Sequence, residues 1–174
     1  MQQDRTILTG RERRFSPDEF IVSKTDAKGI ITYANDVFLR IADYTLEEVI
    51  GKPHNLIRHP HMPRSVFKLL WHRIKSGNEI FAYVVNRSKN GDHYWVLAHV
   101  TPSFDASGNV IGYHSNRRLP KPETVALVEP LYRQLRTIED SAPKIQQGVE
   151  SSMRELQSWI NKNGGNYDAI ILSI

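Results

Sequence analysis

Residues 86–95 read Asn-Arg-Ser-Lys-Asn-Gly-Asp-His-Tyr-Trp and carry the strongest local prediction in the chain. Their central pair, Asn90-Gly91, is typical of a tight hairpin turn, because both residue types readily adopt positive φ angles. Residue types that favour strands flank this pair on both sides. We therefore predict two paired antiparallel strands, over residues 79–87 and 93–102.

A second informative stretch, residues 52–60, reads Lys-Pro-His-Asn-Leu-Ile-Arg-His-Pro. Its prolines and charged side chains are poor candidates for a buried core, so packing alone does not explain it. The Arg58 guanidinium and the histidines can donate hydrogen bonds to a phosphate or carboxylate. The loop and the hairpin together predict a ligand pocket. The alternative for Arg58 is an ion pair with a nearby acid such as Asp36.

The composition is that of an ordinary folded protein, with 40% hydrophobic and 24% charged residues among 174. The sequence has no cysteine, which excludes disulfides, zinc ribbons, thiol nucleophiles and thiol photoadducts. Its net charge of +4 comes from dispersed basic residues, so nucleic-acid binding is not expected. No membrane-spanning apolar run or secretory signal is recognisable, which predicts a cytoplasmic protein.

Further elements are expected on both sides of the loop. Residues 20–33 predict a first hairpin, and residues 37–42 and 66–74 have the apolar spacing of helices. Between these helices, residues 45–48 form a capping box. A fifth strand is expected at 110–118. Two strands, several helices and three strands predict an α+β fold, in which a five-stranded antiparallel sheet has helices on one face.

The domain of residues 20–120 is expected to have extensions. Residues 1–19 are polar and charged, as in a flexible or docking N-terminal arm. Residues 121–163 contain C-terminal amphipathic helices, and residues 164–174 form a tail without a readable pattern. In the second helix, apolar residues spaced by four, four, three and four predict a partner-facing surface or short coiled coil. These residues are Ile145, Val149, Met153, Leu156 and Ile160.

Four motifs point to a family. They are Tyr33-Ala-Asn-Asp36, Gly51-Lys-Pro-His54, Arg58-His-Pro60 and the block at 86–95. With the order of elements, they closely resemble the PAS domain of the aerotaxis-receptor (Aer-like) family over residues 20–135. Glu129-Pro-Leu-Tyr132 is similar to the exit helix of that family. The resemblance implies a PAS fold and a sensory rather than enzymatic role.

The resemblance also implies a cofactor. Members of the family hold FAD noncovalently between the sheet and the helices, and pass its redox state to chemotaxis signalling proteins. By resemblance, the cofactor-binding residues are Asn35, His54, Arg58, His59, Phe67, Trp71 and Asn86. Two positions depart from the family pattern, because His61 replaces an aspartate and Ile80 replaces a tryptophan. Both positions matter to flavin binding in the family, so a domain that has lost FAD is an alternative.

Some of these residues have a second explanation. The Asn86 amide can both donate and accept hydrogen bonds, which suits the uracil-like edge of a flavin, or it can brace the hairpin. Trp71 lies on an apolar helix face and is by its surroundings a core residue, unless the resemblance holds. Alternation along the strand predicts that one of Tyr94 and Trp95 is buried and that the other is exposed, where it would suit docking.

Two other functions are considered. A haem-binding gas sensor would use a loop histidine or His72 as its axial ligand. A cofactor-free PAS module would act only by docking or by forming a homodimer through the C-terminal helices. A metal site at His54, His59 and His61 is not expected, because no carboxylate or thiolate lies close in sequence. Catalysis is not expected either, since the chain has no nucleophile elbow or phosphate-cradling glycine loop.

Overall fold

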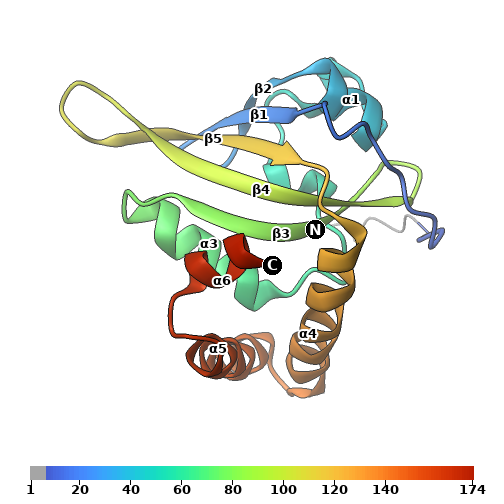
Figure 1. Cartoon of the computed structure of the whole chain (residues 1–174). Coiled ribbons are helices and arrows are strands. Elements are labelled where there is room, and N and C mark those ends of the chain that lie inside the picture. Colours follow the sequence, from blue (N-terminus) through green and yellow to red (C-terminus); the bar gives the residue numbers. More distant parts are fainter. Residues whose placement is uncertain (1–6) are drawn as a thin grey trace.

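The computed structural model describes residues 7–174 (Figure 1). Five described strands form one antiparallel sheet in the order β2-β1-β5-β4-β3. The strands are β1 (Ile21–Asp26), β2 (Ile31–Ala34), β3 (Ile80–Arg87), β4 (His93–Phe104) and β5 (Val110–Arg118). The predicted α+β fold with its five-stranded sheet is confirmed.

The central hairpin joins β3 and β4 through the turn at residues 88–92. Its strands are in register, with Asn86 opposite Tyr94 and Arg87 opposite His93. Gly91 has a φ of 95°, a conformation that a side chain would disfavour. The Asn90-Gly91 pair therefore has the role that the sequence predicts.

Helices cover one face of the sheet and enclose the core with it. They are α1 (Asp36–Ala42), α2 (Leu46–Val49), the 3₁₀ helix η1 (His54–Ile57) and α3 (Arg64–Lys75). The predicted capping box begins α2, where Thr45 and Glu48 satisfy each other's backbone N–H groups. Phe38, Ile57, Val66 and Ile74 are buried against apolar residues of the sheet. This packing fixes the positions of the loop at 52–60 and of α3.

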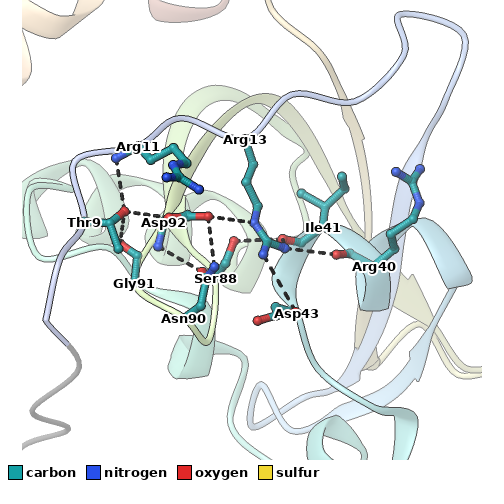
Figure 2. A network of polar contacts seen from close by, with 10 residues as sticks. All are labelled: Thr9, Arg11, Arg13, Arg40, Ile41, Asp43, Ser88, Asn90, Gly91 and Asp92. Atoms are coloured by element: carbon teal, nitrogen blue, oxygen red, sulfur yellow. Dashed lines mark hydrogen bonds and ion pairs between the residues drawn. The ribbon is translucent and has the colours of Figure 1, made fainter.

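The N-terminal arm, predicted at residues 1–19, is described from residue 7 onward and docks on its own domain. The Arg13 backbone N–H donates to the His93 carbonyl (2.7 Å), and His93 donates to the Arg11 carbonyl (2.9 Å). The Arg13 side chain donates to the carbonyls of Arg40 and Ile41 at the end of α1, both at 3.3 Å (Figure 2). The described part of the arm therefore joins β4 to α1.

Asp92 holds this arm to the hairpin (Figure 2). Its carboxylate accepts hydrogen bonds from the Thr9 hydroxyl (2.6 Å), the Asn90 amide (2.9 Å) and the Arg13 guanidinium (3.0 Å). The Thr9 bond, followed by those from Asn90 and Arg13, lowers the pKa of Asp92 to about 2. The carboxylate is therefore ionised at neutral pH.

Three C-terminal helices pack beside β3 and α3 (Figure 1). They are α4 (Pro122–Ser141), α5 (Ile145–Lys162) and α6 (Tyr167–Ser173). The α4 helix continues through Pro130. The α6 helix lies in the predicted tail, and its carbonyl at Ile171 accepts a hydrogen bond from the Tyr83 hydroxyl of β3 (3.4 Å). None of the helices among residues 7–174 combines the length and apolar character needed to cross a membrane.

The predicted apolar face of α5 is confirmed at Leu156 and Ile160 and wrong in the first half of the helix. Its buried residues are Gly148, Ser152, Leu156 and Ile160, and they face the chain's own α3 and α4. Ile145, which the sequence places in the stripe, is 66% exposed. Small residues replace apolar ones on this face because α5 approaches α4 closely. A homodimer through the C-terminal helices stays a prediction.

The expectation that one of Tyr94 and Trp95 is exposed is also wrong. Both side chains are buried. The Trp95 ring lies 5.9 Å from that of Tyr132, because α4 covers this end of the outer sheet face. The Tyr132 hydroxyl donates to the Tyr83 carbonyl at 2.5 Å, which satisfies a backbone group at the edge of β3.

Candidate ligand-binding site

A cavity of about 410 Å³ lies between the sheet and the helices, within the size range of small-molecule sites. Its apolar wall combines residues of α3 with residues of β3, β4 and β5. These are Phe67, Leu70, Trp71, Ile74, Val84, Ala98, Val100 and Tyr113. Polar side chains interrupt this wall at one region of the sheet and along the loop at 52–60. The cavity therefore offers an apolar slot with a few directed polar groups.

Arg117 is the principal polar group in this wall and is only 2% exposed. Its Nε donates to the Ser115 hydroxyl (3.0 Å), and its Nη2 donates to the Ser23 hydroxyl and to the Nε2 of His54 (2.9 Å). Its Nη1 has no hydrogen-bond partner among the described residues. Among residues 7–174, no carboxylate forms an ion pair with Arg117. Arg117 thus lines the cavity as a buried charge, and its fully buried Nη1 is an unused donor.

His54 completes this polar cluster as a neutral imidazole. Its Nε2 accepts from Arg117, so the proton of the neutral ring lies on Nδ1. Burial, with a smaller contribution from the Arg117 charge, lowers the pKa of His54 to about 3. Burial also lowers the pKa of Arg117 to about 10, which keeps the guanidinium charged at neutral pH. The cluster therefore has one positive charge.

Asn86 and Arg58 lie side by side, because a backbone bridge joins β3 to the end of the loop. The Arg58 guanidinium lies over the Phe67 ring, 4.4 Å from its centroid. Burial, followed by repulsion from Arg64, lowers the pKa of Arg58. Among the described residues no ion pair joins Arg58 to Asp36, so that alternative is not formed. Both Asn86 and Arg58 line the cavity.

The cavity carries a strong charge bias. Lys28, Arg58, Arg64 and Lys68 line it together with Arg117, whereas none of its described lining residues is acidic. Such an arrangement favours an anionic ligand, because each cation stabilises negative charge and can donate to phosphate oxygens. Trp71 limits the cavity toward the β1–β2 turn, where its ring packs edge-on against Tyr113 with centroids 5.4 Å apart.

Comparison with known proteins assigns the domain. The PAS fold family matches residues 31–117. The chain belongs to the PAS fold family. The chain is 37% identical to the aerotaxis receptor of Escherichia coli over 155 residues, which are 89% of this chain and 29% of the receptor. It is 27% identical to the nitrogen fixation regulatory protein of Klebsiella pneumoniae over 97 residues, 56% of this chain and 20% of that protein.

This PAS protein spans less than a third of the length of these curated relatives. Among solved structures, the light state of the Aureochrome1 LOV photoreceptor matches with a TM-score of 0.54 and 25% identity. The match covers 62% of this chain and 85% of that one. A light-oxygen-voltage domain from a study of a flavin analogue matches the fold with a TM-score of 0.56 at 20% identity, over 66% and 87% of the two chains. The domain is therefore a sensory PAS domain related to the aerotaxis receptor.

Five residues selected from the sequence line the cavity of the PAS domain: His54, Arg58, Phe67, Trp71 and Asn86. Asn35 does not. Its side-chain carbonyl accepts from the Phe38 and Val22 N–H groups, both at 3.0 Å, and so caps α1 and ties it to β1. Whether the five lining residues bind a cofactor stays a prediction.

His59 also lies outside the cavity lining. Its buried ring lies 4.8 Å from that of His61 and 5.8 Å from that of His93. Burial, followed by the neighbouring charge of His61, lowers the pKa of His59 to about 4. Of the two positions that depart from the family pattern, His61 belongs to this cluster and Ile80 is buried in the core. Neither is among the lining residues.

Sequence reasoning missed the residues that supply most of the cavity's polarity: Ser23, Lys28, Arg64, Lys68, Ser115 and Arg117. A pattern for the last two was available. Tyr113, Ser115 and Arg117 alternate along β5 and therefore share one face with each other. What the sequence did not show is that this face is the one that α3 covers.

Proposed function

We propose that this PAS domain binds FAD in the cavity and signals its redox state to a partner of the chemotaxis type. The observation that carries this proposal is Arg117, a buried cation with an unused donor and no carboxylate partner among the described residues. An uncompensated buried charge is unfavourable unless a ligand accepts its hydrogen bond. Carbonyl oxygens of a flavin ring are suitable acceptors.

The rest of the cavity fits the parts of a flavin dinucleotide. Apolar side chains such as Leu70 and Val84 provide surfaces for a flat ring, and the Asn86 amide can donate to and accept from its polar edge. Lys28, Arg58, Arg64 and Lys68 offer positive charge for a pyrophosphate. The identity with the aerotaxis receptor supports the same cofactor class and a signalling partner.

A bound flavin supplies a reversible change in charge and protonation upon reduction. Arg117 would respond first, because a positive charge in a low-dielectric wall favours negative charge on the ligand beside it. The guanidinium donates to both His54 and the Ser23 hydroxyl, so any shift of Arg117 alters the Ser23–His54 contacts. A cytoplasmic location, a sensory rather than catalytic role and a homodimer through the C-terminal helices belong to the same proposal.

Haem is less well supported than flavin. The Nε2 of His54, the histidine of the cavity wall, is already engaged by Arg117 and by the Ser23 hydroxyl at 3.1 Å. An axial ligand needs a free ring nitrogen. The cluster of Arg117, His54 and Ser23 therefore favours a ligand with acceptor atoms over one that binds through a metal.

The test is an absorption spectrum of the purified protein before and after incubation with FAD, followed by titration of the apoprotein. Flavin bands that persist through gel filtration support the proposal. Arg117→Met should lower the affinity for FAD on the order of 10- to 100-fold, whereas Arg118→Met should leave it unchanged, because Arg118 is exposed beside Phe20. A Soret band would show that the cofactor is haem and not flavin. A protein that stays colourless after incubation with excess FAD would favour the cofactor-free docking module.

A further inference from the structure

Three helices meet at one buried carboxylate, that of Glu139 in α4. This residue is 4% exposed. Its Oε2 accepts from the backbone N–H of Arg64 (3.0 Å) and its Oε1 from that of Ser65 (2.9 Å), the first two residues of α3. Arg136 of α4 also donates to Oε2 at 3.0 Å. Glu139 therefore connects α4 to the start of α3.

The start of α3 needs such a partner. A helix leaves its first N–H groups without internal acceptors, and a nearby side chain or ligand usually satisfies them. Here the preceding residue is Pro63, which makes no side-chain cap. A carboxylate at a helix N-terminus also interacts favourably with the helix dipole. The cap of α3 thus comes from an element 74 and 75 residues away along the chain.

The α5 helix is fixed at the same place. The Ser152 hydroxyl lies 2.7 Å from that of Ser65, and both residues are buried. Gly148 lies directly on the backbone of Glu139, because a Cβ at this position would be 2.4 Å from the Glu139 carbonyl oxygen. These contacts, called here the Glu139 latch, comprise Glu139, Ser65, Gly148 and Ser152.

The helix that the latch holds is also a wall of the cavity. Arg64 donates its N–H to Glu139 and lines the cavity, and Phe67 and Trp71 follow along the same helix. The carboxylate also acts on the Arg58 guanidinium, whose pKa it raises against the larger effects of burial and Arg64. A ligand in the cavity would contact α3, and the Glu139 latch holds the start of the same helix. Both therefore act on one rigid element.

We propose that the Glu139 latch couples occupancy of the cavity to the docking of α4 and α5. A ligand that fixes α3 stabilises the latch, because the capping geometry requires a fixed start of the helix. By thermodynamic reciprocity, an opened latch weakens binding of the ligand by the same factor. This inference rests on the proposed function for the identity of the ligand, and it assigns α4 and α5 as the output.

The test uses hydrogen exchange of the whole chain with and without FAD, and FAD titrations of two variants. FAD should slow exchange at residues 136–152 in the wild-type protein. Glu139→Ala should accelerate exchange there and at the start of α3, and weaken FAD binding by about five-fold or more. Glu129→Ala removes an exposed carboxylate of the same helix and should change neither. Ser152→Ala, which loses one hydrogen bond, should shift both quantities less and in the same direction.

Failure of the flavin proposal and failure of the coupling give different results. If the wild-type protein binds no FAD, the flavin proposal fails. The coupling can then still be tested with Phe67→Ala, because this substitution perturbs the cavity wall without a ligand. The coupling predicts faster exchange in α5 for Phe67→Ala but not for Phe20→Ala, which truncates an exposed ring. If FAD binds but exchange at residues 136–152 is unchanged, or if Glu139→Ala binds FAD as the wild type does, the coupling is wrong.

Discussion

Arg117 and Glu139 are both buried and both charged, yet their surroundings differ. Each oxygen of the Glu139 carboxylate accepts a backbone hydrogen bond, and Arg136 provides an opposite charge. Arg117 has two serines, a neutral histidine and the ring of Phe38 (5.3 Å from its centroid) as partners, and one unused donor. A charge whose partners are all within the fold stabilises the fold. A buried charge that lacks a hydrogen-bond partner within the fold indicates a ligand that supplies the missing acceptor.

The largest expected effect is on the satisfied charge. Glu139→Ala leaves two helix N–H groups without an acceptor and Arg136 with Asp140 as its remaining partner. The substitution should therefore lower the free energy of unfolding by about 2–4 kcal/mol. Urea denaturation followed by circular dichroism measures the change. Glu129→Ala serves as the control, with an expected change below about 0.5 kcal/mol. If the two substitutions lowered the free energy of unfolding equally, the buried hydrogen bonds of Glu139 would not be what stabilises the fold.

The unsatisfied charge should behave in the opposite way. Arg117→Met replaces a buried cation by an apolar side chain of similar length, so the free energy of unfolding of the apoprotein should stay the same or rise by about 1 kcal/mol. FAD affinity should fall on the order of 10- to 100-fold, the value of a charged hydrogen bond. Denaturation and fluorescence titration measure the two quantities. A strongly destabilised Arg117→Met apoprotein would show that Arg117 is structural.

A third substitution tests how tightly the Glu139 latch is packed. Gly148→Ala places a Cβ 2.4 Å from the Glu139 carbonyl oxygen, so α5 must move away from α4. We expect a loss of about 1–3 kcal/mol in the free energy of unfolding. The control is Gln147→Ala, which truncates an exposed side chain next to Gly148 in the same helix. Thermal unfolding of both variants measures the difference. A smaller loss of stability for Gly148→Ala than for the control would contradict the packing argument.

The smallest effect concerns Asp92, a second fully bonded carboxylate at the hairpin. Its pKa falls from 3.8 to about 2 in the folded protein, so its stabilising contribution is present at neutral pH and is lost as the pH falls from about 4 to 2. Exchange protection of residues 9–13 should decrease over that range. Asp92→Asn should remove this pH dependence. Protection that stays constant through pH 2 in the wild-type protein would show that other contacts hold the arm.

Local sequence patterns predicted the elements well where neighbouring residues determine the structure. The Asn90-Gly91 turn and the Thr45–Glu48 capping box depend on contacts within a few residues. The first half of the buried face of α5 could not be predicted in this way. Its buried face contains Gly148 and Ser152, and small residues become an interface only when another helix approaches closely.

The candidate site divides along the same line. His54, Arg58 and Asn86 stand in motifs that the family resemblance identifies, and all three line the cavity. Arg117 stands in no motif, and Asn35, which does, caps a helix instead. A motif identifies residue types at a spacing, whereas membership of a cavity depends on which strand face the helices cover.

The sequence by itself determined the order of strands and helices, the central turn and the absence of thiol chemistry, because each follows from residue type or from contacts between near neighbours. The tertiary structure alone decided that Arg117 faces the cavity and that Glu139 caps α3. The latter bonds join residues 74 and 75 positions apart, and the Ser65–Ser152 contact joins residues 87 apart. Contacts of that range exist only after the sheet and helices have packed, since no local pattern encodes their geometry.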